Sequence, residues 1–202
     1  MKKSLIFIIA IVALIAIVAF VKGPSFYNEG ITLKEDATAQ WGNVESSYQR
    51  RADLIPNIVN TAKGYAEFEQ ETLTKVIEAR SKATSITIDP TNITPEKMEQ
   101  FQKVQESMTG ALSRLLAVFE RYPDLKANEN FKELINELER TENRINVERN
   151  RFNESAKPFN NHIQIFPNNM LNKFFGKWDP ISYFKAKEGS DEAPEVDFDF
   201  GS

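Results

Sequence analysis

The sequence predicts an all-α protein, with an N-terminal transmembrane helix followed by an antiparallel up-and-down four-helix bundle. Three observations predict this fold class. Residues 5–21 are apolar without interruption. The later segments repeat apolar residues every three or four positions, as amphipathic helices do. No segment alternates apolar and polar residues over the length of a typical strand.

The apolar run at residues 5–21 follows Lys2 and Lys3 and precedes Lys22. As a helix it would be roughly 26 Å long, near the lower limit for crossing a bilayer. Cleavage of this segment as a signal peptide is disfavoured, because Pro24 directly follows the best small-residue cleavage pattern. We therefore expect residues 1–23 to be a retained single-pass membrane anchor. The flanking lysines favour a domain on the outer, periplasmic face only slightly.

The first two amphipathic stripes run over residues 26–48 and 54–83. Asp53 is placed to cap a second helix, and Pro56 is tolerated in a first helical turn, where its missing N–H costs nothing. These features predict a helix boundary at residues 50–56. The alternative is a bundle of three long helices, in which the first two stripes form one helix kinked near Pro56.

The third and fourth stripes run over residues 98–122 and 131–166. Thr94, Pro95 and Glu96 predict the start of the third helix, because they supply a cap, a proline at the first position and an early acid. Pro123 is expected to end this helix, and Asn128 or Asp124 to cap the next one. The short connections favour antiparallel neighbours in the bundle.

Composition limits the function. The chain has 25 basic and 29 acidic side chains, and setting aside Lys2, Lys3 and Lys22 leaves 22 against 29, a net charge of −7. This excess of acid argues against nucleic-acid binding. The absence of cysteine excludes disulfides and thiol chemistry. We expect the bundle to cover residues 24–184, and the acidic residues 185–202 to be disordered.

Charged residues also fall on the apolar stripes: Glu69 and Arg80 on the second, Glu142 and Arg149 on the fourth. If these side chains face inward they must pair, because an unpaired buried charge costs several kcal/mol. We expect a buried polar layer of interhelical ion pairs, and a carboxylate cluster that binds a cation is the alternative. A histidine-based dimetal site is not predicted, since the single histidine, His162, lacks the Glu-x-x-His spacing.

Polar residues gather at the first and third helix junctions, which an up-and-down bundle places at the end far from the membrane. They serve there as caps and turn residues, or as a docking head for a partner protein. These candidate docking residues are Arg50, Arg51, Asp53, Asn57, Tyr122, Asp124, Lys126 and Asn128.

Several strings resemble motifs of the LemA family over about residues 27–183. They are Arg50-Arg51-Ala52-Asp53-Leu54-Ile55-Pro56-Asn57, Lys63-Gly64-Tyr65, Glu78-Ala79-Arg80, Leu112-Ser113-Arg114-Leu115-Leu116, Tyr122-Pro123-Asp124-Leu125-Lys126-Ala127-Asn128, Thr141-Glu142-Asn143-Arg144-Ile145, Phe152-Asn153 and Phe166-Pro167. The resemblance implies a bacterial protein with one N-terminal span and a cytosolic or exported four-helix domain, and we then expect that span in the cytoplasmic (inner) membrane. It implies no assigned catalytic activity.

The sequence contains no catalytic constellation, and we expect neither an enzyme nor a bound cofactor. The favoured function is a protein-interaction or scaffold module of the bacterial cell envelope, anchored in the membrane by one span. Its partner would be an unidentified envelope protein, and self-association into a homo-oligomer is compatible with this function. The alternative function is a carboxylate-based metal-binding or metal-dependent hydrolytic protein.

Overall fold

The computed structural model describes residues 2–64 and 69–185, and every regular element in these ranges is a helix. The long helices are α1 (Lys2–Lys63), α2 (Gln70–Ser85), α3 (Pro95–Phe119) and α5 (Glu129–Gln164). The short ones are α4 (Pro123–Ala127), α6 (Asn168–Leu171) and the π-helical turn η1 (Asn172–Gly176). The prediction of an all-α protein is confirmed. Most of the acidic segment at residues 185–202 lies outside the described residues.

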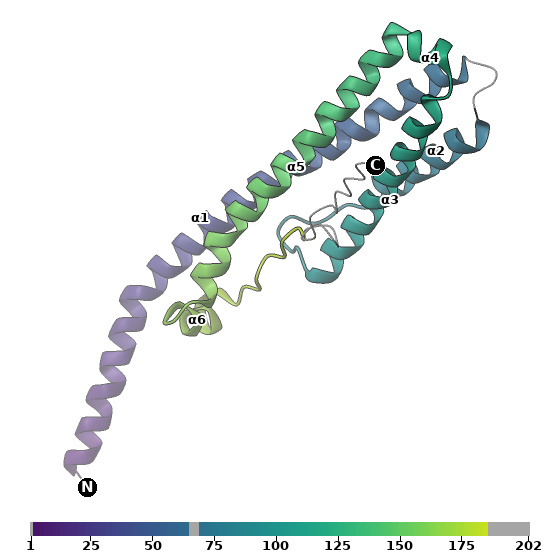
Figure 1. Cartoon of the computed structure of the whole chain (residues 1–202). Coiled ribbons are helices and arrows are strands. Elements are labelled where there is room, and N and C mark those ends of the chain that lie inside the picture. The colour runs from purple at the N-terminus through teal and green to yellow at the C-terminus, as the bar shows by residue number, and fades with distance from the viewer. Residues whose placement is uncertain (1, 65–68, 186–202) are drawn as a thin grey trace, which may run out of the picture.

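Helix α1 runs along the whole length of the bundle (Figure 1). Helix α5 packs along it in the opposite direction, while α2 and α3 form an antiparallel pair whose α2 member also contacts α1. The N-terminal part of α1 continues beyond the other helices. Over the described residues, no helix has both the length and the apolar character needed to cross a membrane. The transmembrane assignment of residues 5–21 therefore stays a prediction.

The expected helix boundary at residues 50–56 is wrong, because α1 continues through Pro56 to Lys63. Asp53 consequently caps no helix; it lies on the exposed side of α1 and accepts a hydrogen bond from Gln49. The three-helix alternative is wrong as well, since the second stripe is divided between the end of α1 and α2. Helix α1 ends at Lys63, directly before Gly64.

The survival of α1 at Pro56 has a physical reason. Proline lacks the N–H that would donate to the carbonyl oxygen of Ala52, one helical turn earlier. In this structure that oxygen accepts a hydrogen bond from Nε of Arg80 on α2, at 2.7 Å. Arg80 therefore replaces the bond that Pro56 cannot make, and it joins α2 to α1 at this point.

The predicted caps of the later helices are confirmed. Oγ1 of Thr94 accepts a hydrogen bond from the backbone N–H of Lys97 at the start of α3, where Pro95 is the first residue. Oδ1 of Asn128 accepts one from the backbone N–H of Phe131 at the start of α5. These caps satisfy backbone donors that the helices themselves leave unpaired.

The described residues form two buried clusters, which we call the distal core and the proximal core. The distal core lies away from the N-terminus of α1, is mostly aliphatic, and draws on α1 to α5. The proximal core is rich in aromatic rings and draws on α1, α3, α5 and the non-helical residues 86–94 and 177–185. Fully buried members of the distal core include Ile55, Leu73, Met108, Leu115, Leu125 and Phe131, and those of the proximal core include Trp41, Met98, Phe152 and Phe159.

Candidate functional site

Arg51 on α1 is the centre of a buried polar layer between the two cores. Its side chain is only 1% exposed, and Nη1 donates to Oε1 of Glu142 at 2.7 Å and to Oγ1 of Thr109 at 2.9 Å. Nη2 donates to Oε1 of Gln105 at 2.7 Å. The guanidinium also lies over the ring of Tyr48, 5.0 Å from its centroid. A buried charge needs such partners, because leaving it unpaired costs several kcal/mol.

The layer occupies the same level on each helix that it contacts. On α1, Arg51 lies between Tyr48 of the proximal core and Ala52 of the distal core. On α3, Gln105 lies between Phe101 and Met108 of the two cores, and its Nε2 donates to the backbone of α2 at Ala83. The layer therefore links α1, α2, α3 and α5, and it fixes their register.

The structure places the four residues predicted to form a buried layer in different environments. Glu142 takes part in the layer, with Arg51 as its partner. Arg80 is the partner of the Ala52 carbonyl described above. Arg149 donates to the Lys185 carbonyl at 3.0 Å and lies over the Phe184 ring.

Glu69 does not face inward. It is exposed at the start of α2 and forms an ion pair with Arg121 at 2.8 Å, with 42% and 64% of the two side chains exposed. The expectation that Glu69 belongs to an inward-facing layer is therefore corrected, because α1 ends before this position and a new helix starts there.

The eight candidate docking residues do not form one cluster at the end of the bundle. Arg50 pairs with Glu137 at 2.6 Å, and Glu137 lies nine residues beyond Asn128, roughly 13 Å further along α5. Arg51 is buried, which removes it from any exposed surface. The continuation of α1 past residue 56 explains both shifts, since it moves residues 50–53 to the middle of the bundle.

The remaining docking candidates lie nearer the distal end. Asp124 and Lys126 are exposed on α4, where Lys126 forms an ion pair with Glu120. Tyr122 is half-buried at the residue before α4, and Asn128 is the cap of α5. Asn57 is exposed on α1 and lines a groove between α1 and α5.

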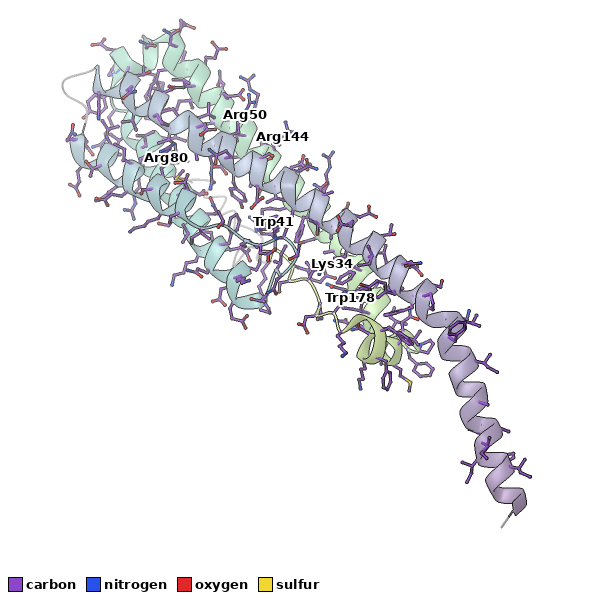
Figure 2. All side chains as sticks on the ribbon, turned by 180° about the vertical axis from the view of Figure 1, so that it is seen from behind. Lys34, Trp41, Arg50, Arg80, Arg144 and Trp178 are labelled. Carbon is purple, nitrogen blue, oxygen red and sulfur yellow. The ribbon has the colours of Figure 1, made fainter. Side chains whose placement is uncertain are left out.

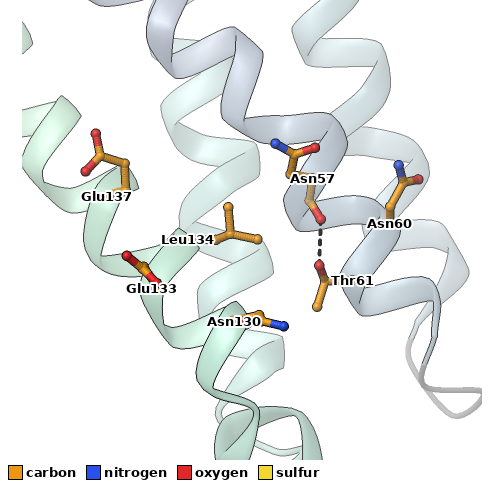
Figure 3. A pocket seen from close by; sticks show the side chains of 7 residues that line it. All are labelled: Asn57, Asn60, Thr61, Asn130, Glu133, Leu134 and Glu137. Atoms are coloured by element: carbon orange, nitrogen blue, oxygen red, sulfur yellow. Dashed lines mark hydrogen bonds between the residues drawn. The ribbon is translucent and has the colours of Figure 1, made fainter.

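That distal groove has a volume of about 620 Å³. Figure 3 shows the lining side chains: Asn57, Asn60 and Thr61 from α1, and Asn130, Glu133, Leu134 and Glu137 from α5. Hydrogen bonding to Arg50 lowers the pKa of Glu137, which keeps this carboxylate ionised. The groove thus offers amide donors and acceptors, acidic oxygens and one apolar side chain.

The described residues contain no group of three or more His, Cys, Asp or Glu side chains placed to hold a metal ion. The two carboxylates of the proposed cation cluster are also occupied separately. Glu69 pairs with Arg121, and Glu142 pairs with Arg51. The geometry therefore gives the carboxylate alternative no support.

Sequence reasoning missed the asparagines that bind residues 177–185 to α5. Asn160 donates from Nδ2 to the Ile181 carbonyl and accepts from the Ile181 N–H, both at 2.8 Å. Asn153 holds the backbone of Phe184 in the same way, at 2.9 Å. Seven residues of helix rise roughly 10.5 Å, and three extended residues span roughly 10 Å. The spacing of Asn153 and Asn160 therefore matches that of Phe184 and Ile181.

His162 is buried between α5 and α1. Its Nε2 lies 2.9 Å from the Phe26 carbonyl oxygen, and its ring stacks on the Phe26 ring at 4.6 Å. A carbonyl oxygen can only accept, so Nε2 carries the proton. His162 thereby fastens the end of α5 to α1.

The fold and this geometry define a class: an all-helical bundle organised by a buried arginine, without a catalytic constellation among the described residues. Comparison with known proteins agrees with the motifs. The sequence profile of the LemA family matches residues 40–198. The chain belongs to the LemA family.

Individual relatives are between 26% and 29% identical to this chain. The chain is 29% identical over 145 residues to Protein LemA of Metamycoplasma hominis, covering 72% of this chain and 62% of the relative. It is 27% identical over 184 residues to Magnetosome protein MamQ of Magnetospirillum gryphiswaldense, and 26% identical to Magnetosome protein MamQ 2 of Paramagnetospirillum magneticum. These two matches cover 82% of this chain and 66% of each relative. The chain thus spans somewhat less than two thirds of the length of these relatives.

Proposed function

We propose that this LemA-family chain is a membrane-anchored, non-enzymatic interaction module of the bacterial cell envelope. In this proposal residues 5–21 span the inner membrane, and the bundle stands on its outer face. The distal groove between α1 and α5 receives a segment of a partner protein. The observation that carries the proposal is that the apolar run and the groove belong to one unbroken helix, α1.

The anchor is supported by the apolar side chains at the start of α1. Phe7, Ile9, Ile17 and Phe20 are each more than half exposed, with Phe20 at 83%. Burying one such side chain is worth about 1.5–3 kcal/mol. A row of them without protein partners favours placement of this helix in lipid.

The docking function is supported by the chemistry and the position of the groove. Asn57, Asn60 and Asn130 present amide groups, which can pair with the N–H and C=O groups of a bound peptide. Glu133 adds an exposed acidic side chain to the groove, which favours a partner segment with a basic residue, whereas Glu137 is already paired with Arg50. Residue 57 lies 36 positions beyond residue 21, roughly 54 Å along α1. A rigid helix would hold the groove at that distance from the bilayer.

Site-directed photocrosslinking tests the docking function. A photoreactive amino acid at Asn60, in the full-length chain in its native membrane, should capture one discrete partner. Asn130→Arg in the same chain should abolish the product, since it fills the groove with a bulky cation. The matched control is Asn143→Arg, at an exposed asparagine of α5 outside the groove. Equal capture by both variants would refute docking in this groove.

Protease treatment of intact cells with a permeable outer layer tests the sidedness. A bundle on the outer face should be digested there, whereas a cytosolic control protein survives. Survival of the bundle until the inner membrane is lysed would place it on the other face and reverse this part of the proposal.

A further inference from the structure

An exposed apolar lobe lies at the other end of the bundle. After α5 the chain turns through residues 165–177, which include α6 and η1. Phe166 and Phe174 are each 73% exposed, and Ile165 and Met170 are more than half exposed. An exposed cluster of large apolar side chains on a folded protein marks an interaction surface.

The lobe is held firmly against α1. Asn172 donates to the Trp178 carbonyl at 2.9 Å and accepts from the Trp178 N–H at 3.0 Å, which closes the turn. Trp178 in turn stacks on Tyr27 of α1 and leaves no room for a side chain at Gly30, where a Cβ would lie 2.1 Å from its ring. The exposed rings are therefore presented by a packed structure.

The position of the lobe along α1 is fixed by Phe175. A Cβ added at Gly23 would lie 2.9 Å from the Phe175 ring, so the lobe touches α1 two residues beyond the apolar run. Figure 1 shows α6 beside α1 at the level where α1 leaves the bundle, and Figure 2 shows Trp178 at the same level. The exposed rings thus lie where a span over residues 5–21 would end.

The charge of this region suits an anionic lipid surface. Lys22, Lys173 and Lys177 are exposed around the lobe and outnumber the neighbouring exposed acids Glu29 and Asp179, although the chain as a whole is acidic. Aromatic side chains concentrate at the membrane–water boundary. Lysines extend their amines toward headgroups while their stems stay among apolar groups. Rings together with lysines at this level match both preferences.

We propose that residues 165–177 lie in the headgroup region of an anionic phospholipid bilayer, as a second membrane contact beside the span. This inference rests on the proposed anchoring of residues 5–21. With two contacts fixed to each other through Gly23 and Gly30, α1 cannot tilt freely, and the distal groove keeps one orientation to the membrane.

The test uses single cysteines, because the natural chain has none. Phe174→Cys, Ile11→Cys and Asn60→Cys are each labelled with the environment-sensitive dye NBD. The full-length proteins are reconstituted in vesicles of phosphatidylethanolamine and phosphatidylglycerol. At position 174 the emission should shift to shorter wavelength and be lost with lipids that carry a quencher near the headgroup. At position 11 quenchers deep in the acyl chains should act, and at position 60 neither should.

Each other outcome has a defined meaning. A water-like signal at position 174 with deep quenching at position 11 would refute membrane contact by residues 165–177 and would still support the anchoring of residues 5–21. Absence of quenching at position 11 overturns both. Shielding at position 174 that ignores lipid quenchers and grows with protein density would show contact between copies of the chain, and overturns the lipid assignment. If Phe174→Cys fails to fold by circular dichroism, Phe166→Cys reports on the same surface.

Discussion

In the distal half of the bundle, helices close around mostly aliphatic side chains, whereas the proximal half is completed by non-helical segments packed on aromatic rings. Helix α2 supplies Leu73 and Val76 to the distal core. In the proximal core, Ile181 and Phe184 come instead from the non-helical residues 177–185. An extended segment lacks the internal hydrogen bonds of a helix, so its buried backbone N–H and C=O groups need other partners. Asparagine side chains of α5 provide them for Ile181 and Phe184. The comparison teaches that an extended segment can complete a helical core when side chains of a neighbouring helix make its hydrogen bonds.

Helices α1, α3 and α5 pass through both halves, and the Arg51 layer joins them. We therefore expect the halves to unfold together. Both tryptophans, Trp41 and Trp178, lie with the proximal core, so their fluorescence reports on that half while circular dichroism reports on all helices. In urea the two signals should give the same midpoint.

The largest expected effect is that of Glu142→Ala. It removes the carboxylate partner of the buried Arg51 charge, and we expect a loss of about 3 kcal/mol in the free energy of unfolding, because a buried charge is left without its counter-ion. The same urea titration measures it. The control is Glu139→Ala, an exposed acid on the same helix. A loss no larger than that of the control would mean that the layer is not what joins the halves.

Next in size is Asn160→Ala, which acts on the proximal half. The N–H and C=O groups of Ile181 lose their partner while buried, and we expect a cost of about 2 kcal/mol. Residues 177–185 should also become sensitive to protease, and the Trp178 emission should shift to longer wavelength. Asn161→Ala, at the exposed neighbour, is the matched control. Unchanged protease resistance would show that ring packing alone holds this segment.

These contacts explain what the sequence does and does not reveal. The helical stripes and the caps at Thr94 and Asn128 depend on neighbours within a few residues, and they are readable from the chain. The continuation of α1 through Pro56 depends on Arg80, 24 positions away, and local rules predict a break there instead. The sequence places Arg51 at a helix junction among the candidate docking residues, whereas its burial depends on partners in α3 and α5. The match between the spacing of Asn153 and Asn160 and that of Phe184 and Ile181 can be recognised only once the folded structure shows the two segments side by side.

A smaller effect is expected from Arg80→Met, which removes the donor to the Ala52 carbonyl and should cost about 1–2 kcal/mol. In a Pro56→Ala background the new N–H of residue 56 can donate to the same carbonyl. Arg80→Met should therefore cost less stability in that background than in the natural chain. Urea midpoints of the four proteins give this coupling directly. Equal losses in both backgrounds would show that Arg80 acts by packing and does not compensate for the proline.

The smallest effect concerns pH. Burial raises the pKa of Tyr48, against the lowering influence of Arg149 and Arg51, from its ordinary value of 10.0. Above about pH 10 the unfolded chain therefore releases this proton before the folded chain does, and the free energy of unfolding falls as pH rises further. Tyr48→Phe keeps the ring against Phe101 and should remove this part of the alkaline loss. Comparing urea midpoints of the two proteins from pH 8 to above 10 measures the difference. Parallel curves would mean that Tyr48 titrates no differently in the folded chain, and that the proximal core admits water beside Arg51.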